Sequence, residues 1–355
     1  MKRWLLHILI SLACMWLSSC QNDVMMPDED NGKVEVHLEI AIAGGDGTTS
    51  RGFEDGGTDP DTDDQKSMTK DDVFVLVFQN DRLIDQVKGL ELLGTDGNAT
   101  RELTGVFTQP ANTSNIELVV LANLVQNNLK GITNNPTLLG IQAAIDGWSG
   151  FTKEQVYQNL IYQYDASPGN WAIGARRIPM WGTTGEQDFT KANHLETSCN
   201  LHRAVAKLGF RINDDAPASF ALTRVTIKGA MNEGYCAPLN TSNLGNDNYF
   251  TSPFIPSSVN GQTIIYTLNN VTDSYENKIY LPEQAINFTP LTIEIGYSLN
   301  ATAKSATVNF DENVIRNHSY IYNITIKEDL SSNIKTDILS TVEGWNYVDV
   351  GSDYE

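Results

Sequence analysis

The clearest periodic pattern in the chain is a strict alternation of apolar and polar residues over positions 33–43. Side chains two positions apart share one face of a strand, so this spacing predicts a half-buried strand of unusual length. The apolar face consists of Val34, Val36, Leu38, Ile40 and Ile42. His37 falls on the polar face, and we interpret it as a solvated strand residue.

The alternation stops after residue 43, and the next segment has no hydrophobic period. Residues 44–52 are rich in Gly, Thr and Ser, and residues 54–72 are acidic, so we expect an exposed linker over 44–72. Alternating carboxylates at 59–64 look at first like a calcium loop. However, Asp64 stands where an EF-hand turn needs glycine and Lys70 where it needs a bidentate glutamate. A solvated acidic linker is therefore the favoured interpretation.

The middle of the chain contains buried strands and one helical excursion. Residues 73–78 and 116–121 are continuous apolar runs, typical of strands covered on both faces. The apolar spacing then becomes helical. The residues at this spacing are Leu138, Ile141, Ile145 and Trp148, followed by Val156, Leu160 and Tyr164. Thr152 and Gln155 form a capping-box pattern that predicts the start of the second helical segment.

Strand follows strand from about residue 195 to the end of the chain. Residues 204–212, 291–299 and 320–327 read as strands, and turn signals such as Asn260-Gly261 separate such segments. This pattern predicts a mainly β protein of antiparallel sheets packed face to face. We expect domains at 73–195 and 196–355, and the strand at 33–43 is expected to complete the first of them.

Composition narrows the function classes. The chain has 24 Lys+Arg against 44 Asp+Glu, a net charge of −20, which argues against binding to a nucleic-acid backbone. Its 355 residues and 41% hydrophobic content suit about two packed domains. The sequence contains no H-E-x-x-H, C-x-x-C or G-x-S-x-G motif and no glycine-rich phosphate loop. We therefore predict no enzymatic activity, no cofactor and no metal.

The N-terminus has the form of an export signal. Lys2 and Arg3 precede an apolar stretch, and Leu17-Ser18-Ser19-Cys20 resembles the lipobox of bacterial lipoproteins. Residues 1–19 are thus expected to be removed, leaving Cys20 lipidated and the chain held at the outer membrane by its acyl groups. The residue after the cysteine is Gln21 and not the aspartate that is associated with retention in the inner membrane. Cys199 and Cys236 remain, either as one bridge or as two buried thiols.

Several short phrases stand out in order along the chain. Besides the lipobox and the early strand, they are Ile178-Pro179-Met180-Trp181-Gly182, Leu201-His202-Arg203-Ala204-Val205-Ala206-Lys207, Tyr280-Leu281-Pro282-Glu283, Arg316-Asn317-His318-Ser319-Tyr320 and Val342-Glu343-Gly344-Trp345-Asn346. Taken together, these phrases resemble the fimbrillin family, the type V pilins of Gram-negative gut and oral bacteria. The resemblance implies two transthyretin-like β-sandwich domains, export as a lipoprotein, and assembly into a filament after a protease removes the first strand.

The residues around position 51 are compatible with removal of the first strand by a protease. An Arg-specific protease could reach Arg51 in the polar linker and leave Gly52 as the new N-terminus, so that residues 20–52 act as a propeptide and 53–72 as an acidic linker. Arg82 and Arg101 are poorer sites because they fall within the expected domain. Departure of the first strand would open an apolar groove that demands a replacement strand.

In the family, the incoming strand is thought to come from the C-terminal segment of a neighbouring subunit. Here that segment maps to residues 334–350, with Ile338, Val342, Trp345 and Val348 as the candidate donor side chains. Its alternation is imperfect, and the alternative is that it is the last strand of its own domain.

The function expected from this reading is that of a fimbrial subunit whose partners are other subunits, the outer-membrane lipid, an Arg-specific surface protease and an unidentified receptor. Stalk, tip and anchor roles stay open. An alternative of another class is a surface glycan-binding lipoprotein that keeps its N-terminal strand and uses Trp148 or Trp171 against sugar rings. A surface hydrolase is a weaker third reading.

Overall fold

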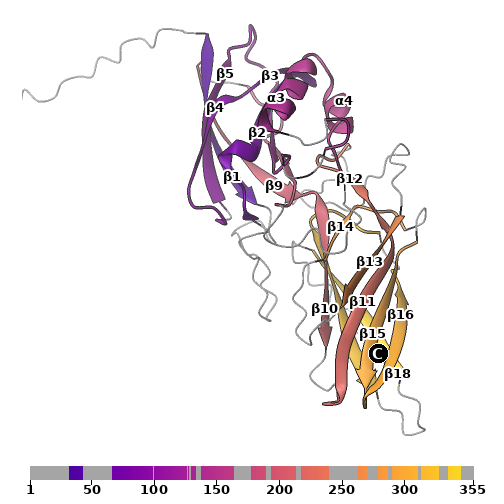
Figure 1. Ribbon diagram of the computed structural model, residues 1–355. Helices are drawn as coiled ribbons and strands as arrows, with labels where there is room; N and C mark the ends of the chain where they lie inside the picture. The colour runs from indigo at the N-terminus through magenta and orange to yellow at the C-terminus, as the bar shows by residue number, and fades with distance from the viewer. Residues whose placement is uncertain are drawn as a thin grey trace, which may run out of the picture. The chain divides into compact units, whose positions relative to one another are not determined.

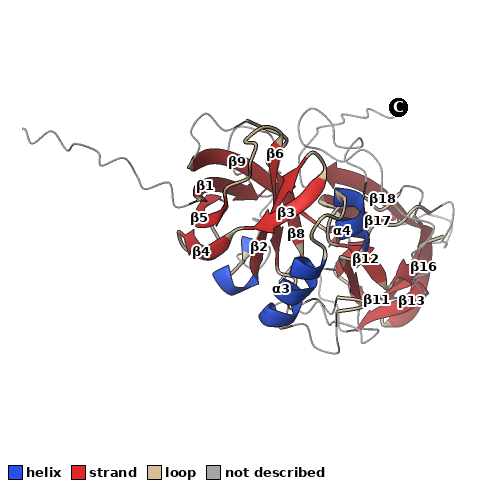
Figure 2. Ribbon diagram, turned by 90° about the horizontal axis from the view of Figure 1, so that it is seen from above, coloured by secondary structure: helices blue, strands red, loops and turns tan. Residues whose placement is uncertain are grey.

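The computed structural model describes the following parts of the 355-residue chain. They are residues 32–42, 66–98, 100–125, 127, 129–132, 137–163, 177–188, 193–212, 217–239, 263–269, 279–286, 290–310, 313–327 and 335–344. The fold in these residues is mainly β, as the sequence predicted (Figures 1 and 2). Among them no helix is both long enough and apolar enough to cross a bilayer.

Strands dominate the described residues. The strands are β1 (Lys33–Ile42), β2 (Val73–Gln79), β3 (Arg82–Gln86), β4 (Lys88–Leu93), β5 (Thr100–Thr108), β6 (Ile116–Ala122), β7 (Ile161–Gln163), β8 (Met180–Thr183), β9 (His194–Arg203), β10 (Val205–Ile212), β11 (Phe220–Met231), β12 (Glu233–Tyr235), β13 (Thr263–Asn269), β14 (Ile279–Pro282), β15 (Thr292–Leu299), β16 (Thr302–Asn309), β17 (His318–Lys327) and β18 (Lys335–Gly344). The helices are the 3₁₀ turn η1 (Lys70–Asp72), α3 (Leu138–Gly147) and α4 (Lys153–Gln158).

The N-terminal half is built on one eight-stranded sheet with the order β3-β2-β6-β8-β9-β1-β5-β4. Its two end strands, β3 and β4, follow each other along the chain with only Val87 between them, so the sheet turns back on itself at that residue. Val87 joins the turn to the body of the sheet by donating its backbone N–H to the carbonyl of Val75, at 2.8 Å. Strand β1 lies inside this order rather than at an edge.

One side of the eight-stranded sheet encloses a hydrophobic core, which we call the inner cluster. It consists of Val34, Val36, Leu38, Ile40, Ile42, Met68, Val73, Val75, Val77, Val87, Leu103, Phe107, Ile116, Leu118, Val120, Ala122, Met180, Leu195, Cys199 and Leu201. All these side chains are buried, and they come from β1, β2, β5, β6, β8 and β9 together with two connecting residues. The regular alternation of β1 therefore places its five aliphatic side chains in the centre of this core.

Strands β2 and β6 are buried on both faces, which confirms the interpretation of their continuous apolar runs. Alternate residues of β2, such as Val75, enter the inner cluster, while the intervening ones, such as Phe74 and Phe78, face a second core shared with α3 and α4. Helix α3 lies beside β2 in Figure 1. Because both faces of β2 and β6 are buried, neither face needs polar side chains. The alternation of apolar and polar residues is therefore absent from these two strands.

The helical excursion begins where the sequence predicted and ends earlier. Thr152 caps α4, its side chain accepting from the Gln155 backbone N–H while the Gln155 side chain accepts from the Thr152 N–H, so the predicted capping box is confirmed. The helix ends at Gln158, and residues 161–163 instead form β7, which pairs with β12. The helical spacing that continued to Tyr164 was therefore wrong beyond Gln158, because Ile161–Gln163 finds a strand partner far along the chain.

The C-terminal half contains two four-stranded sheets, with the orders β14-β10-β17-β18 and β13-β11-β15-β16. Side chains of both enter one hydrophobic cluster, including Leu208 of β10, Ile227 of β11, Ile295 of β15 and Tyr322 of β17. The sheet pairings are mostly antiparallel, as expected, but β10 pairs with β17 in parallel and β1 pairs with β9 in parallel.

Two expected boundaries fall elsewhere in the structure. The linker expected over 44–72 ends earlier, because Met68 is 1% exposed, belongs to the inner cluster and is followed by the turn η1. The boundary expected at 195/196 falls inside β9, a strand of the eight-stranded sheet that runs on to Arg203. The neighbouring β10, which belongs to a C-terminal sheet, begins only two residues later at Val205.

Candidate functional site

Strand β1 and the groove that holds it form the candidate functional site. The side chains of Val34, Val36 and Leu38 are fully buried, and Ile40 and Ile42 are at most 4% exposed. Burial of an aliphatic side chain contributes about 1.5–3 kcal/mol, so these five contribute on the order of 7–15 kcal/mol gross to keeping β1 in the sheet. All five residues that the sequence assigned to the apolar face are thus brought together.

Backbone pairing holds β1 on both sides. It pairs in parallel with β9 from Glu35 opposite His194 to Ile42 opposite Leu201, and its other neighbour in the sheet is β5. The Glu35 N–H extends the ladder by donating to the carbonyl of Asn193 at 2.9 Å. Removal of β1 would leave unpaired backbone groups along both β9 and β5, flanking an apolar groove, which is the arrangement that accepts an added strand.

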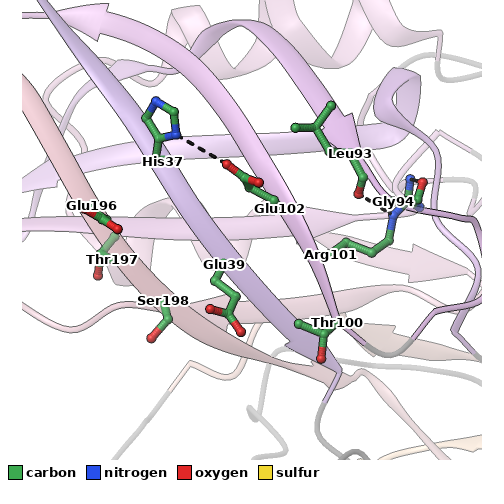
Figure 3. Close-up of a pocket in the computed structure, with 10 residues that line it drawn as sticks. All are labelled: His37, Glu39, Leu93, Gly94, Thr100, Arg101, Glu102, Glu196, Thr197 and Ser198. Atoms are coloured by element: carbon green, nitrogen blue, oxygen red, sulfur yellow. Dashed lines mark hydrogen bonds and ion pairs between the residues drawn. The ribbon is translucent and has the colours of Figure 1, made fainter.

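The outer face of β1 is polar and lies over a shallow depression shared with β5 and β9 (Figure 3). His37 Nδ1 lies 3.3 Å from Glu102 Oε1 of β5, and the two side chains point toward each other. Glu39 and Glu196 add further carboxylates around the same depression. This surface is therefore acidic and exposed, in contrast to the apolar inner face of the same strand.

Hydrogen bonds anchor the chain at Ser67 and Met68, near the start of the next described segment after β1. Asp96 accepts hydrogen bonds from Ser67 Oγ at 2.7 Å and from the Met68 N–H at 2.8 Å. Arg101 donates from Nη1 to the Met68 carbonyl at 2.8 Å. Burial alone would raise the pKa of Asp96, but the bonds from Ser67 and Met68, with Arg177 and Arg101 nearby, leave that pKa lowered. A cut upstream of residue 66 thus leaves these anchoring contacts in place.

The arginines inside the fold are poor protease substrates. Arg101 lies in β5 and is 8% exposed. Arg82 lies in β3 and donates to the carbonyl of Gly150 at 2.8 Å. A protease needs several residues of extended, unpaired backbone, which neither position offers. The predicted cleavage pair Arg51 and Gly52, and the predicted lipidation site Cys20, lie outside the described residues.

The candidate donor segment is a strand of its own subunit in this structure. Ile338 and Val342 lie in β18, which pairs antiparallel with β17 along its whole length, from Lys335 opposite Lys327 to Gly344 opposite His318. Among the described residues, β18 stands at the edge of its sheet and pairs with β17 alone. Trp345 and Val348 lie outside the described residues.

Three of the phrases behind the family resemblance meet in one buried polar cluster. Arg316 Nη2 donates to Glu283 Oε2 at 2.5 Å and to the Tyr235 carbonyl at 3.1 Å, and both members of the ion pair are almost fully buried. The Arg203 N–H donates to Asn317 Oδ1 at 3.2 Å, and the Asn317 N–H returns a bond to the carbonyl of Val205 at 2.8 Å. These contacts fix the chain where β9 gives way to β10.

Neither the cysteines nor the tryptophans form a second site among the described residues. Cys199 and Cys236 are free and buried in different clusters, and burial raises the pKa of the Cys199 thiol to about 12. Trp181 is a core residue, 1% exposed, and Trp148 packs partly buried against the α3 and α4 core. Trp171, the other aromatic candidate for sugar binding, lies outside the described residues.

Sequence reasoning missed the neighbours of the functional strand. His194 lies opposite Glu35, and Glu102 lies beside His37, but both are far from β1 in the sequence. The only local signal was the polar alternation of β1 itself, which shows that these side chains face outward and not what they face.

Comparison with known protein families and with curated proteins finds no match to this chain. Among solved structures, it is similar to a putative cell adhesion protein from Parabacteroides distasonis, with a TM-score of 0.50 and 12% identity over 89% of this chain and 98% of that one. A fimbrial assembly protein from the same species gives a TM-score of 0.47 at 13% identity, covering 88% of this chain and 99% of that one. The fimbrial anchor protein Mfa2 from Porphyromonas gingivalis gives 0.36 at 10% identity, covering 89% and 100%. The first of these likenesses shows a shared fold over nearly the whole chain.

Proposed function

We propose that the chain is a structural subunit of a cell-surface fimbria, exported as a lipoprotein, trimmed after Arg51 and polymerised by donor-strand exchange. Its partners are other fimbrial subunits, and it ends at the cell surface in an adhesive filament. The sequence phrases that resemble the fimbrillin family and the fold shared with a putative cell adhesion protein support this role. In this proposal the two halves act as two transthyretin-like β-sandwich domains.

The single observation that carries the proposal is the setting of β1. An N-terminal strand is held in the middle of a sheet by an apolar face and two neighbouring strands. Because the strand is continuous with the rest of the chain only through the intervening segment, one cut there makes it a separate peptide. That peptide is then held by noncovalent contacts alone.

Strand exchange follows from the energetics of the vacated groove. Exposure of the inner cluster and of two unpaired strand edges is costly, so the cleaved subunit is driven to accept a strand from a neighbour. Strand β18 is suited to the donor role, because it stands at a sheet edge and its described pairing is the ladder with β17. On entering the groove, a donor strand would pair with both β9 and β5.

Replacement of Arg51 tests the proposal. In cells that make the protein, we expect the wild-type chain to appear as a denaturation-resistant ladder on gels and as filaments in electron micrographs. The Arg51→Ala chain is expected to stay a lipidated monomer. Arg82→Ala, which changes an arginine held in β3, serves as the matched control and is expected to polymerise normally. Polymers of Arg51→Ala as abundant as those of the wild type would contradict the proposed cleavage.

A further inference from the structure

The outer face of β1 carries a group of metal-ligating side chains that the proposed function does not use. Glu35 and His37 of β1 and His194 of β9 each offer one ligand atom, and these atoms all lie within 4.8 Å of one another. The imidazole rings of His37 and His194 have their centroids 5.1 Å apart. Two of the five histidines in the chain are thus brought together from positions far apart in the sequence.

Strand register produces this grouping. Glu35 lies directly opposite His194 in the parallel β1–β9 ladder, so their side chains stand on the same face of the sheet. His37 follows two residues later on that face, next to the pair. The group therefore spans two strands, with two of its members on β1 and one on β9.

The neighbouring strand β5 supplies a supporting carboxylate. His37 Nδ1 lies 3.3 Å from Glu102 Oε1, a separation at which the imidazole N–H can donate to the carboxylate (Figure 3). That hydrogen bond fixes the ring and leaves Nε2 available as a ligand, as carboxylates do behind histidine ligands in zinc proteins. Glu39 and Glu196 add negative charge to the same depression, which attracts a cation.

We propose that Glu35, His37 and His194 bind a borderline transition-metal ion of the Zn²⁺ class, which bridges β1 to β9. Two imidazoles and one carboxylate are a ligand set that zinc accepts with water in the fourth position, whereas Ca²⁺ and Mg²⁺ prefer oxygen ligands alone. Tetrahedral coordination needs ligand atoms about 3.4 Å apart, given zinc–nitrogen bonds of about 2.0–2.1 Å. Glu35 and His37 are exposed and His194 is partly exposed, so small side-chain rotations suffice to close the set.

Because the ion is bound by β1 and β9 together, its binding is coupled to the retention of β1 in the sheet. When β1 leaves the sheet, two ligands leave with it, so the ion binds only the chain that keeps its strand. A free metal concentration one hundred times the dissociation constant would favour the strand-in form about a hundredfold. This consequence rests on the proposed strand release, whereas the binding site itself does not.

Calorimetric titration of the metal-free, full-length chain in detergent with ZnCl₂ tests the site. The wild type is expected to bind one more Zn²⁺ than either His37→Ala or His194→Ala, because each variant breaks the set. The matched control is Glu154→Gln, which changes an exposed carboxylate on α4 that lies outside the ligand group and outside the depression. It is expected to bind as the wild type does. The difference in the number of bound Zn²⁺ ions between the wild type and each variant corrects for weak binding by other carboxylates, which is common to all the proteins.

Equal zinc stoichiometry and affinity in all four proteins would overturn the site, and loss of binding in His37→Ala but not in His194→Ala would overturn the bridge. Far-UV circular dichroism of the metal-free variants verifies folding, and His37→Gln and His194→Gln replace any alanine variant that fails this control. As a second measurement, zinc is expected to raise the thermal midpoint of the wild type and not that of His194→Ala.

A cleavage experiment separates this inference from the proposed function. After treatment with an Arg-specific protease, zinc is expected to slow the loss of the β1 peptide from the wild type and not from His194→Ala. Equal loss with and without bound zinc would overturn the retention role. A β1 peptide that never leaves either protein, with zinc or without it, counts against strand release instead.

Discussion

Truncation of a single buried side chain in β1 tests how strongly the groove holds the strand. Leu38 is fully buried at the middle of β1, where it belongs to the inner cluster, and it lies opposite Thr197 in the ladder with β9. The change Leu38→Ala removes three carbon atoms from a core position and leaves a cavity. Such changes cost about 2–5 kcal/mol of folding free energy.

The matched control is the next residue along the strand. Glu39 lies on the outer face of β1 and is exposed, so Glu39→Ala is expected to change the free energy of unfolding by no more than about 0.5 kcal/mol. Urea unfolding of the uncut chain, followed by tryptophan fluorescence and circular dichroism, measures both variants. A Leu38→Ala chain as stable as Glu39→Ala would refute the claim that the apolar face of β1 holds it in the sheet.

The same truncation has a consequence after cleavage. If β1 is then held by noncovalent contacts alone, a loss of about 2 kcal/mol shifts its dissociation equilibrium by about thirtyfold. We therefore expect the cut Leu38→Ala chain to lose its β1 peptide far more readily on gel filtration than the cut Glu39→Ala chain. Identical retention in the two variants would mean that contacts other than the apolar face hold the strand.

Three further changes probe the structure around the groove and the junction. Arg316→Met is expected to cost about 3–5 kcal/mol in thermal or urea unfolding because it leaves the carboxylate of Glu283 buried and uncompensated, whereas Arg224→Met removes an exposed ion pair and is expected to cost at most about 1 kcal/mol. Gly182→Ala places a Cβ 2.4 Å from the backbone oxygen of Asn200, so we expect a loss of about 1–3 kcal/mol, and a stability unchanged from the wild type would contradict the close approach of β8 and β9. Burial, with the neighbouring arginines, lowers the pKa of His202 to about 3, so between pH 6.5 and pH 3 the unfolded chain binds a proton that the folded chain excludes. The free energy of unfolding of the wild type is therefore expected to include a loss of about 1.4 kcal/mol per pH unit from His202 as the pH falls from 6.5 to 3. Urea unfolding at several pH values is expected to show that this contribution is absent from His202→Asn.

Features set by local spacing could be predicted from the sequence. The alternation of β1, the two-sided burial of β2 and β6 and the capping box at Thr152 were all predicted, because each depends on residues a few positions apart.

Features set by pairing between distant segments could not be predicted. The parallel ladder between β1 and β9 depends on register, and one position of slip would move His194 to the other face of the sheet. For the same reason the phrases containing Glu283 and Arg316 were recognised separately, while their buried ion pair was not. The end of α4 was missed because β7 pairs with β12, about seventy residues away.

The most direct test of the account is the intact mass of subunits extracted from filaments on the cell surface. The account predicts that assembled subunits begin at Gly52 and contain no residues of β1. Assembled subunits that still carry β1, joined through an uncut Arg51 to the rest of the chain, would contradict it.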